Sequence, residues 1–160
     1  MDTHGPVDRA RQRALVATGS SLKLLIGFDE YVAAWVGARV QIEDFGACTA
    51  IGIVDDAENE VIAGVVYNNL REASIEATIA SSTPRWCSRV ILHTIFWYPF
   101  CQLGMSRLTA ITELENDHVR TFLSRLGFQQ EGIMRRGFRS GADAAVYGML
   151  REECRWLKNV

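Results

Sequence analysis

The pattern of hydrophobic and polar positions along this 160-residue chain first predicts a β-hairpin in its N-terminal half. Two apolar runs rich in β-branched residues, Thr49–Val54 and Val61–Tyr67, are separated only by an acidic turn at 55–60. Two such runs around a short polar turn favour antiparallel strands. Residues 73–80 then alternate between apolar and polar positions, which predicts a third strand.

A helix is predicted ahead of the hairpin, over residues 30–41. It follows the apolar run 22–26, and the Asp29 carboxylate can cap it by accepting hydrogen bonds from the N–H groups of the first turn. Apolar residues at helical spacing form one predicted face of this helix. They are Tyr31, Ala34, Trp35 and Ala38.

A second helix is predicted after the third strand. Pro84 suits its first turn, where the N–H groups have no partner inside the helix. The helix should end near Trp97, because Pro99 would interrupt the hydrogen bonds of a helix interior. After a turn at Gly104, residues 107–112 are apolar and rich in β-branched side chains, which predicts a fourth strand.

The last third of the chain carries clear signals for the start and end of a helix. Asn116 can cap a helix over residues 117–126, and Gly127 can end it. Two further strands are predicted at 129–135 and 144–151.

The resulting order is α-β-β-β-α-β-α-β-β, which predicts an α/β fold with a mixed sheet of about six to seven strands. The third and fourth strands must be parallel if they are adjacent, because a helix crosses over between them. Ligands bind at the carboxyl ends of strands joined in this way. The loop 81–89 occupies that position.

Composition favours one domain and no polyanionic partner. Apolar residues make up 48% of the chain, enough for a single domain over residues 22–160, and the first 21 residues are predicted to be loosely ordered. Lys and Arg number 17 against 19 Asp and Glu. The net charge of −2 gives no general attraction to nucleic acid or membrane, and we expect neither as a partner.

Signals for export and for metal binding are absent from the sequence. The longest apolar stretch, 90–100, is interrupted by His93 and Thr94 and is shorter than the ~20 residues that span a bilayer. The N-terminus has acidic and small residues where a signal peptide is basic and then apolar. The four cysteines and three histidines show no zinc-site spacing. We expect a cytoplasmic protein with reduced thiols and no metal.

Three motifs near the C-terminus resemble a known superfamily. They are Ile111-Thr-Glu-Leu-Glu-Asn116, Arg120-Thr-Phe-Leu-Ser-Arg-Leu-Gly-Phe128 and Glu131-Gly-Ile-Met-Arg135. This stretch is similar to the C-terminal half of GNAT N-acetyltransferases, most of all to the branch of the ribosomal-protein N-terminal acetyltransferases. The resemblance covers roughly residues 22–156. It implies the GNAT fold and transfer of an acetyl group from acetyl-CoA to a primary amine, by direct attack in a ternary complex.

The coenzyme loop departs from the family pattern. In GNAT enzymes a Q/R-x-x-G-x-G/A loop holds the pyrophosphate through backbone N–H groups, whereas here Arg85-Trp86-Cys87-Ser88-Arg89 contains no glycine. A helix N-terminus, serine hydroxyls and two arginines can still bind a pyrophosphate. In the alternative interpretation the arginines form a solvated basic face beside a core tryptophan. The expected coenzyme-binding residues are Ile79, Ala80, Ser81, Ser82, Arg85, Trp86, Ser88, Arg89, Asn116 and Phe122.

Acetyl transfer requires a base to remove a proton from the amine and a donor for the developing oxyanion. The resemblance assigns the oxyanion donor to a backbone N–H near Ile79 or Ala80. Glu76, on the polar side of the same strand, is the first candidate for the base, with an exposed strand carboxylate as the alternative. Glu113 and Glu115 at the end of the fourth strand are the next candidates.

A proton donor for the leaving thiolate is harder to find. Many family members use a tyrosine four residues before the Gly-Phe pair, a position that is Leu123 here. Tyr147 on the last strand is the candidate, with a packing role as the alternative. His93 and His118 are expected to be solvated or satisfied side chains rather than catalysts.

The acceptor pocket is expected to form from the first helix and the loops 42–47 and 136–143, as the resemblance implies. Glu43, Asp44 and Asp143 could attract a cationic amine. The sequence leaves the identity of the amine open.

Three functions therefore remain open. The first is an active N-acetyltransferase. The second is a catalytically weak or inactive GNAT-like module that binds acyl-CoA or a partner, an interpretation motivated by the missing glycines and by Leu123. The third is a purely structural partner protein. The apolar last strand and the habit of the family lead us to expect a homodimer.

Overall fold

The computed structural model describes residues 15–17 and 21–158, which fall into two compact units. The N-terminal unit comprises Met1–Asn68 and Ile79–Ile95, and the C-terminal unit comprises Asn69–Thr78 and Phe96–Val160. Most of the segment predicted to be loosely ordered, residues 1–21, lies outside the described residues. A single domain over 22–160 stays a prediction.

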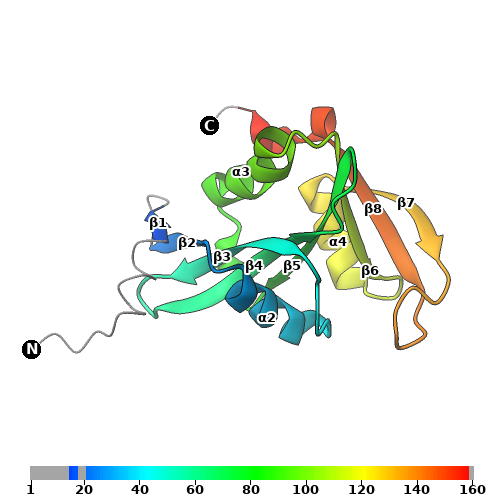
Figure 1. The fold of residues 1–160 in the computed structure, drawn as a ribbon, viewed down its shortest axis with the longest axis horizontal. Coiled ribbons are helices and arrows are strands. Elements are labelled where there is room, and N and C mark those ends of the chain that lie inside the picture. The colour runs from blue at the N-terminus through cyan, green and yellow to red at the C-terminus, as the bar shows by residue number, and fades with distance from the viewer. Residues whose placement is uncertain (1–14, 18–20, 159–160) are drawn as a thin grey trace, which may run out of the picture. The chain divides into compact units, whose positions relative to one another are not determined.

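The N-terminal unit contains an antiparallel sheet in the order β1 (Leu15–Ala17), β2 (Leu22–Ile26), β3 (Cys48–Asp55) and β4 (Glu60–Asn68) (Figure 1). The predicted hairpin is confirmed as β3 and β4. The side chains of both strands are buried over nearly their whole length, so both faces of the pair are covered. Helix α2 covers one face, and on the other face the Tyr67 hydroxyl bonds to the Ile95 carbonyl.

Helix α2 (Asp29–Val40) buries Val32, Val36 and Gly37. The predicted apolar face was wrong, since Tyr31 is half exposed and the two alanines of that face are exposed. Two glycines in the neighbouring strands explain why α2 buries its valine face. A Cβ added at Gly52 would lie 3.0 Å from Val32, and one at Gly64 would lie 2.7 Å from Val36. The valine face therefore packs where the strands have no side chains.

The predicted capping role of Asp29 was also wrong. The helix begins at Asp29 itself, with Phe28 at the N-cap and no side-chain cap hydrogen bond. The Asp29 carboxylate instead accepts a hydrogen bond from the Ala50 N–H at 2.7 Å. The carboxylate thus ties the start of α2 to β3.

The predicted second helix is divided into three pieces. Pro84–Trp86 forms a 3-10 turn, helix α3 spans Arg89–Trp97, and Tyr98–Gln102 continues as a π-helical turn. The α-helix ends at Trp97, as predicted, and the chain continues past Pro99 as a wider turn in which the Leu103 N–H donates to the Tyr98 carbonyl at 3.0 Å. Proline has no N–H to offer the Ile95 carbonyl, and the buried Tyr67 hydroxyl donates to that carbonyl instead, at 2.6 Å.

The C-terminal unit contains strands in the order β5, β6, β8 and β7 (Figure 1). Their bounds are Ser74–Ser81 for β5, Arg107–Glu113 for β6, Gln129–Met134 for β7 and Ala144–Leu150 for β8. The first five residues of β5 belong to this unit. β5 and β6 are parallel, as predicted, whereas β6 with β8 and β8 with β7 are antiparallel.

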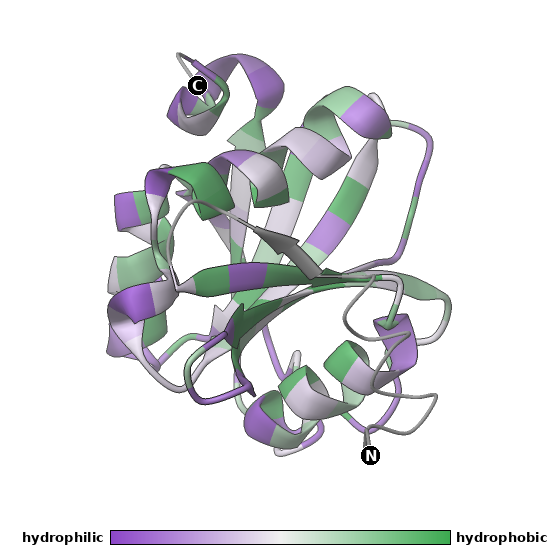
Figure 2. Ribbon diagram, turned by 90° about the vertical axis from the view of Figure 1, so that its left-hand side faces the viewer, coloured by the Kyte–Doolittle hydropathy of each residue, from purple (hydrophilic) through white to green (hydrophobic). Residues whose placement is uncertain are grey.

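Helix α4 (Asp117–Leu126) confirms both of its predicted boundaries. The Asn116 side chain accepts from the Val119 N–H at 3.2 Å, and Gly127 ends the helix at φ 110°, a left-handed conformation that suits glycine. Leu123 and Leu126 are its buried residues. The helices in Figure 2 carry hydrophilic and hydrophobic residues side by side, as expected of helices that cover a sheet on one face only.

The predicted α/β class and element order are confirmed, with β1 and β2 preceding the first helix of the predicted order. The described residues contain eight strands, compared with the six to seven expected. None of the helices in the described part of the chain is long and apolar enough to cross a membrane.

Candidate functional site

In the C-terminal unit, strands β5 and β6 separate after a short parallel contact. The pairing joins only Ser74–Glu76 to Arg107–Thr109, although β6 continues to Glu113. Glu76 lies at the last paired position, so the first candidate base sits where the two strands part. Its carboxylate accepts a hydrogen bond from the Asn69 side-chain amide at 3.0 Å and is half-buried.

The other two candidate catalytic residues lie in the same unit. Glu113 is exposed at the end of β6 and is in register with Ala144 of β8. Tyr147 on β8 is 3% exposed, and its hydroxyl accepts a hydrogen bond from Nε of Arg120 at 3.1 Å. The hydroxyl proton of Tyr147 is therefore directed away from Arg120.

The predicted coenzyme loop lies in the N-terminal unit, and its backbone N–H groups are largely occupied by the loop itself. Arg85 N–H donates to the Thr83 hydroxyl at 3.4 Å, and Ser88 N–H donates to the Trp86 carbonyl at 2.8 Å. The Ser88 hydroxyl then accepts from the Ile91 N–H at 3.3 Å. A glycine-rich loop leaves such donors open for phosphate, so this loop offers a ligand fewer backbone donors.

The side chain of Arg85 in this loop is held in place by Asp55, the last residue of β3. One of its terminal nitrogens lies 3.0 Å from Oδ2 of Asp55, whose side chain is only 3% exposed. The hydrogen bond from the Ala57 N–H, followed by that from Arg85 and its charge, holds the pKa of Asp55 below its usual value against the effect of burial. The Arg85 side chain is 57% exposed, so its other donors lie at the surface.

The remaining coenzyme-loop residues divide between surface and core. Trp86 is 1% exposed and belongs to the core, as in the alternative interpretation of this loop. Ala80 is buried, Ile79 and Ser88 are half-buried, and the rest are exposed. The exposed ones are Ser81, Ser82, Arg85 and Arg89. Contact between these residues and a coenzyme stays a prediction.

These features decide how the loop fits a pyrophosphate group. The backbone donors that the family uses are mostly engaged, and the buried tryptophan takes no part in the surface. The guanidinium groups of Arg85 and Arg89 are exposed and match phosphate geometry. The fit is therefore through side chains rather than through an open backbone cradle.

Asn116 and Phe122 are the predicted coenzyme residues of the C-terminal unit. The Asn116 carbonyl oxygen is engaged in the helix cap, so its amide hydrogens are the groups left for a ligand. Phe122 is half-buried. Leu123, at the family's tyrosine position, is 4% exposed and contributes to the core.

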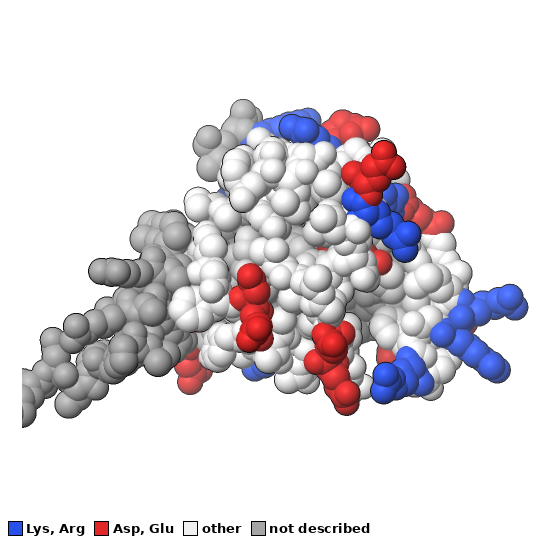
Figure 3. Space-filling model, viewed as in Figure 1, with Lys and Arg blue, Asp and Glu red and all other residues white. Residues whose placement is uncertain are grey.

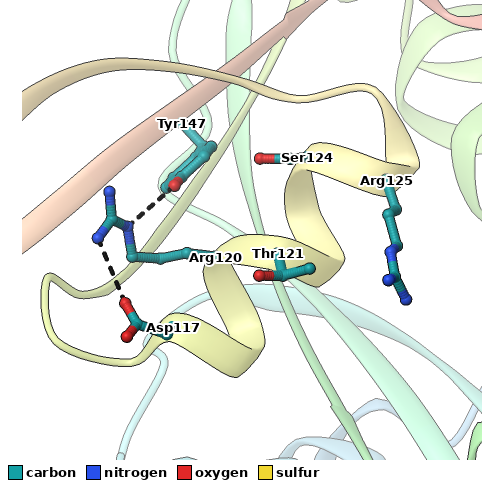
Figure 4. Close-up of a pocket in the computed structure, with 6 residues that line it drawn as sticks. All are labelled: Asp117, Arg120, Thr121, Ser124, Arg125 and Tyr147. Carbon is teal, nitrogen blue, oxygen red and sulfur yellow. Dashed lines mark hydrogen bonds and ion pairs between the residues drawn. The ribbon is translucent and has the colours of Figure 1, made fainter.

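A depression of about 550 Å³ in the C-terminal unit is lined mostly by residues that sequence analysis did not select (Figure 4). Of the predicted site residues, only Tyr147 lines it. The others come from α4 and lie on one polar face of the helix, a stripe at helical spacing that was visible in the sequence. They are Asp117, Arg120, Thr121, Ser124 and Arg125.

All three nitrogens of the Arg120 guanidinium group donate hydrogen bonds in this region. Besides Tyr147, it donates to the Leu114 carbonyl at 2.9 Å and to the Gln130 side chain at 2.8 Å, and it lies 3.6 Å from the Asp117 carboxylate. These contacts occupy most of the N–H donors of Arg120, and they orient Tyr147.

Two of the three predicted acceptor-site acids support local turns. Asp44 accepts a hydrogen bond from the Gly46 N–H at 2.7 Å, and Asp143 accepts one from the Arg136 N–H at 2.8 Å. Glu43 is exposed. His93 is half-buried, His118 is exposed, and no group of potential metal ligands occurs among the described residues.

Comparison with known proteins identifies the fold. No family model matches the sequence, and no curated protein matches it. Among solved structures, a ribosomal-protein-S5-alanine acetyltransferase from Vibrio fischeri matches with a TM-score of 0.67 at 12% identity, covering 88% of this chain and 98% of the other.

Two further structures agree. A spermidine/spermine N-acetyltransferase from Vibrio cholerae matches with a TM-score of 0.64 at 16% identity, covering 82% of this chain and 95% of the other. A GNAT-family acetyltransferase from Bacillus anthracis matches with a TM-score of 0.62 at 14% identity, covering 87% and 99%. The chain therefore has the GNAT acetyltransferase fold that its C-terminal motifs predicted.

Proposed function

We propose that this chain is an acyl-CoA-dependent N-acetyltransferase, which moves an acetyl group from acetyl-CoA to a primary amine by direct attack in a ternary complex. The observation that carries the proposal is the likeness to acetyltransferase structures over at least 82% of the chain. The separation of β5 from β6 at Glu76 supports it, since a carboxylate lies where the paired strands open.

The proposed chemistry needs few side chains. The Glu76 carboxylate takes a proton from the attacking ammonium, directly or through water, and the neutral amine then attacks the thioester carbonyl. The C–S bond breaks as the amide forms, and the thiolate takes a proton from the Tyr147 hydroxyl. The second proton of the attacking nitrogen leaves to water as the amide forms, and water returns a proton to the Tyr147 oxygen. A backbone N–H near Ile79 or Ala80 is the proposed oxyanion donor.

The exposed guanidinium groups of Arg85 and Arg89 are the proposed partners of the coenzyme pyrophosphate. The hydrogen bond to Asp55 supports this role, because it fixes the Arg85 side chain while most of its donors stay exposed. We further propose that the protein acts in the cytoplasm and as a homodimer.

A second candidate function is a GNAT-like module that binds acyl-CoA or a protein without efficient catalysis. Two observations favour it. Leu123 is a buried apolar residue at the position of the family's proton donor, and the coenzyme loop bonds to itself through backbone N–H groups that the family directs at phosphate.

Calorimetric titration with acetyl-CoA, followed by thiol release with a panel of amines, separates these functions. We expect binding, and amine-dependent thiol release that falls by about 10²-fold or more in Glu76→Gln with acetyl-CoA affinity unchanged. The same exchange at the exposed Glu72 is the matched control. Binding without thiol release would favour the module, and absence of binding at millimolar acetyl-CoA would refute both.

A further inference from the structure

The loop joining β7 to β8 carries three exposed arginines, Arg135, Arg136 and Arg139. Their side chains make no hydrogen bond or ion pair with any other residue that the structure describes. Figure 3 shows basic side chains gathered at the end of the C-terminal unit where β7 and β8 are joined. This loop belongs to the region expected to contact the acceptor.

The conformation of this loop is fixed by its own hydrogen bonds and by a close backbone approach. Arg136 adopts φ 53°, and the Asp143 carboxylate accepts its N–H at 2.8 Å. The Phe138 N–H donates to the Ala142 carbonyl at 3.2 Å. A Cβ added at Gly137 would lie 2.5 Å from that of Ala144, so only glycine allows the chain to pass there.

The loop presents a net positive charge to a ligand. Asp143 is its single acid, and one of its carboxylate oxygens accepts the Arg136 N–H. Three guanidinium groups against this one carboxylate leave the loop cationic. Guanidinium forks match phosphate oxygens in geometry and in sign.

A carboxylate capable of holding the amine lies beside this loop in the same unit. Glu113 is in register with Ala144, the residue that follows the loop, and the Leu114 N–H donates to the Asp143 carbonyl at 2.8 Å. Glu113 is exposed, and its carboxylate has no partner among the described residues. One end of the unit thus presents an acid for an ammonium group and, next to it, cations for an anion.

We propose that the acceptor is a phosphate-bearing amine, with its phosphate on the arginine loop and with the Glu113 carboxylate attracting its ammonium group, which Glu76 then deprotonates. This inference rests on the proposed N-acetyltransferase function and specifies its substrate class. A purely cationic polyamine does not fit this end of the unit, because the three arginines repel it.

The test compares aminoalkyl phosphates of increasing length with the amino alcohols of the same length, and with spermidine. We expect at least one phosphate compound to have a kcat/KM about tenfold or more above that of its amino alcohol. In the double variant Arg135→Gln/Arg139→Gln this preference should disappear through KM, with the amino alcohol and acetyl-CoA affinity unaffected. Arg71→Gln, an exposed arginine of the same unit, is the control.

Preference for spermidine or for the amino alcohols would overturn the proposal, as would equal use of carboxylate-bearing amines of matched length. An equal loss in Arg71→Gln would also overturn it. Titration of the aminoalkyl phosphates without acetyl-CoA gives a readout that needs no turnover. Binding that the double variant loses supports the assigned site even if the acetyltransferase function fails, and absence of binding to the wild-type protein refutes the site alone.

Discussion

The hydrogen bond from the Tyr67 hydroxyl to the Ile95 carbonyl should be essential to the stability of the N-terminal unit. In a regular α-helix the N–H of residue 99 would bond to this carbonyl, but residue 99 is proline. Tyr67 is 1% exposed and Ile95 is 2% exposed, so water cannot readily replace the hydroxyl. The tyrosine therefore compensates for a donor that the helix lacks.

Tyr67→Phe removes the donor and leaves the Ile95 carbonyl buried without its 2.6 Å partner. An unsatisfied buried carbonyl costs about 1–3 kcal/mol, and for a chain of this size each kcal/mol corresponds to a Tm shift of about 2–4 °C. Urea unfolding and calorimetry should both report the loss. Tyr31→Phe, at a half-exposed tyrosine, should change the unfolding free energy by no more than about 0.5 kcal/mol.

A double-mutant cycle tests the reasoning itself. Pro99→Ala restores an N–H at the position that can reach the Ile95 carbonyl, so it should reduce the loss caused by Tyr67→Phe, with a coupling energy of about 1 kcal/mol. Equal losses in the two backgrounds would show that the effect comes from packing of the ring rather than from the carbonyl. A loss under about 0.5 kcal/mol in the single variant would refute the account altogether.

Two further predictions concern titrating groups. Arg107 lowers the pKa of Glu131, so this carboxylate stabilises the folded protein above its unfolded pKa and loses that contribution as the pH falls through its folded pKa. The difference in Tm between wild type and Glu131→Gln should therefore be fully present at pH 7, begin to shrink as the pH falls through the unfolded pKa of about 4.3, and vanish only below the lower folded pKa, with Glu72→Gln as control; a constant difference would contradict this. Burial raises the pKa of the Cys87 thiol to about 11, so its alkylation, followed by mass spectrometry, should be slow at neutral pH and accelerate as the pH approaches that value. Rapid labelling at pH 7 would contradict the second expectation.

The sequence by itself determined the elements whose signals are local. Asn116 marks the start of α4 because a cap side chain bonds to an N–H only three residues away. Gly127 marks its end because a residue without a Cβ adopts the left-handed conformation readily. The β3–β4 hairpin and the parallel β5–β6 pair followed in the same way from turn composition and from the helix between them. The C-terminal motifs, read as a resemblance, predicted the fold.

The candidate site was only partly accessible from the sequence. Glu76, Glu113 and Tyr147 were selected by residue type and strand position, and the structure places them in one unit. The role of Arg120 was missed, since its partners at Leu114, Gln130 and Tyr147 come from three separate segments. No periodic pattern in the sequence predicts that these three segments contact one side chain.

Tertiary structure decided what depends on distant partners. The apolar residues of α2 could form more than one face, and the glycines of β3 and β4 selected the one that contains Val32 and Val36. The Asp29 carboxylate bonds to Ala50, twenty-one residues away, instead of capping its own helix. A short-range hydrogen bond can be predicted from neighbours only where no distant group competes for the same partner, as Ala50 does for Asp29, whereas packing depends on which surfaces the whole chain brings together.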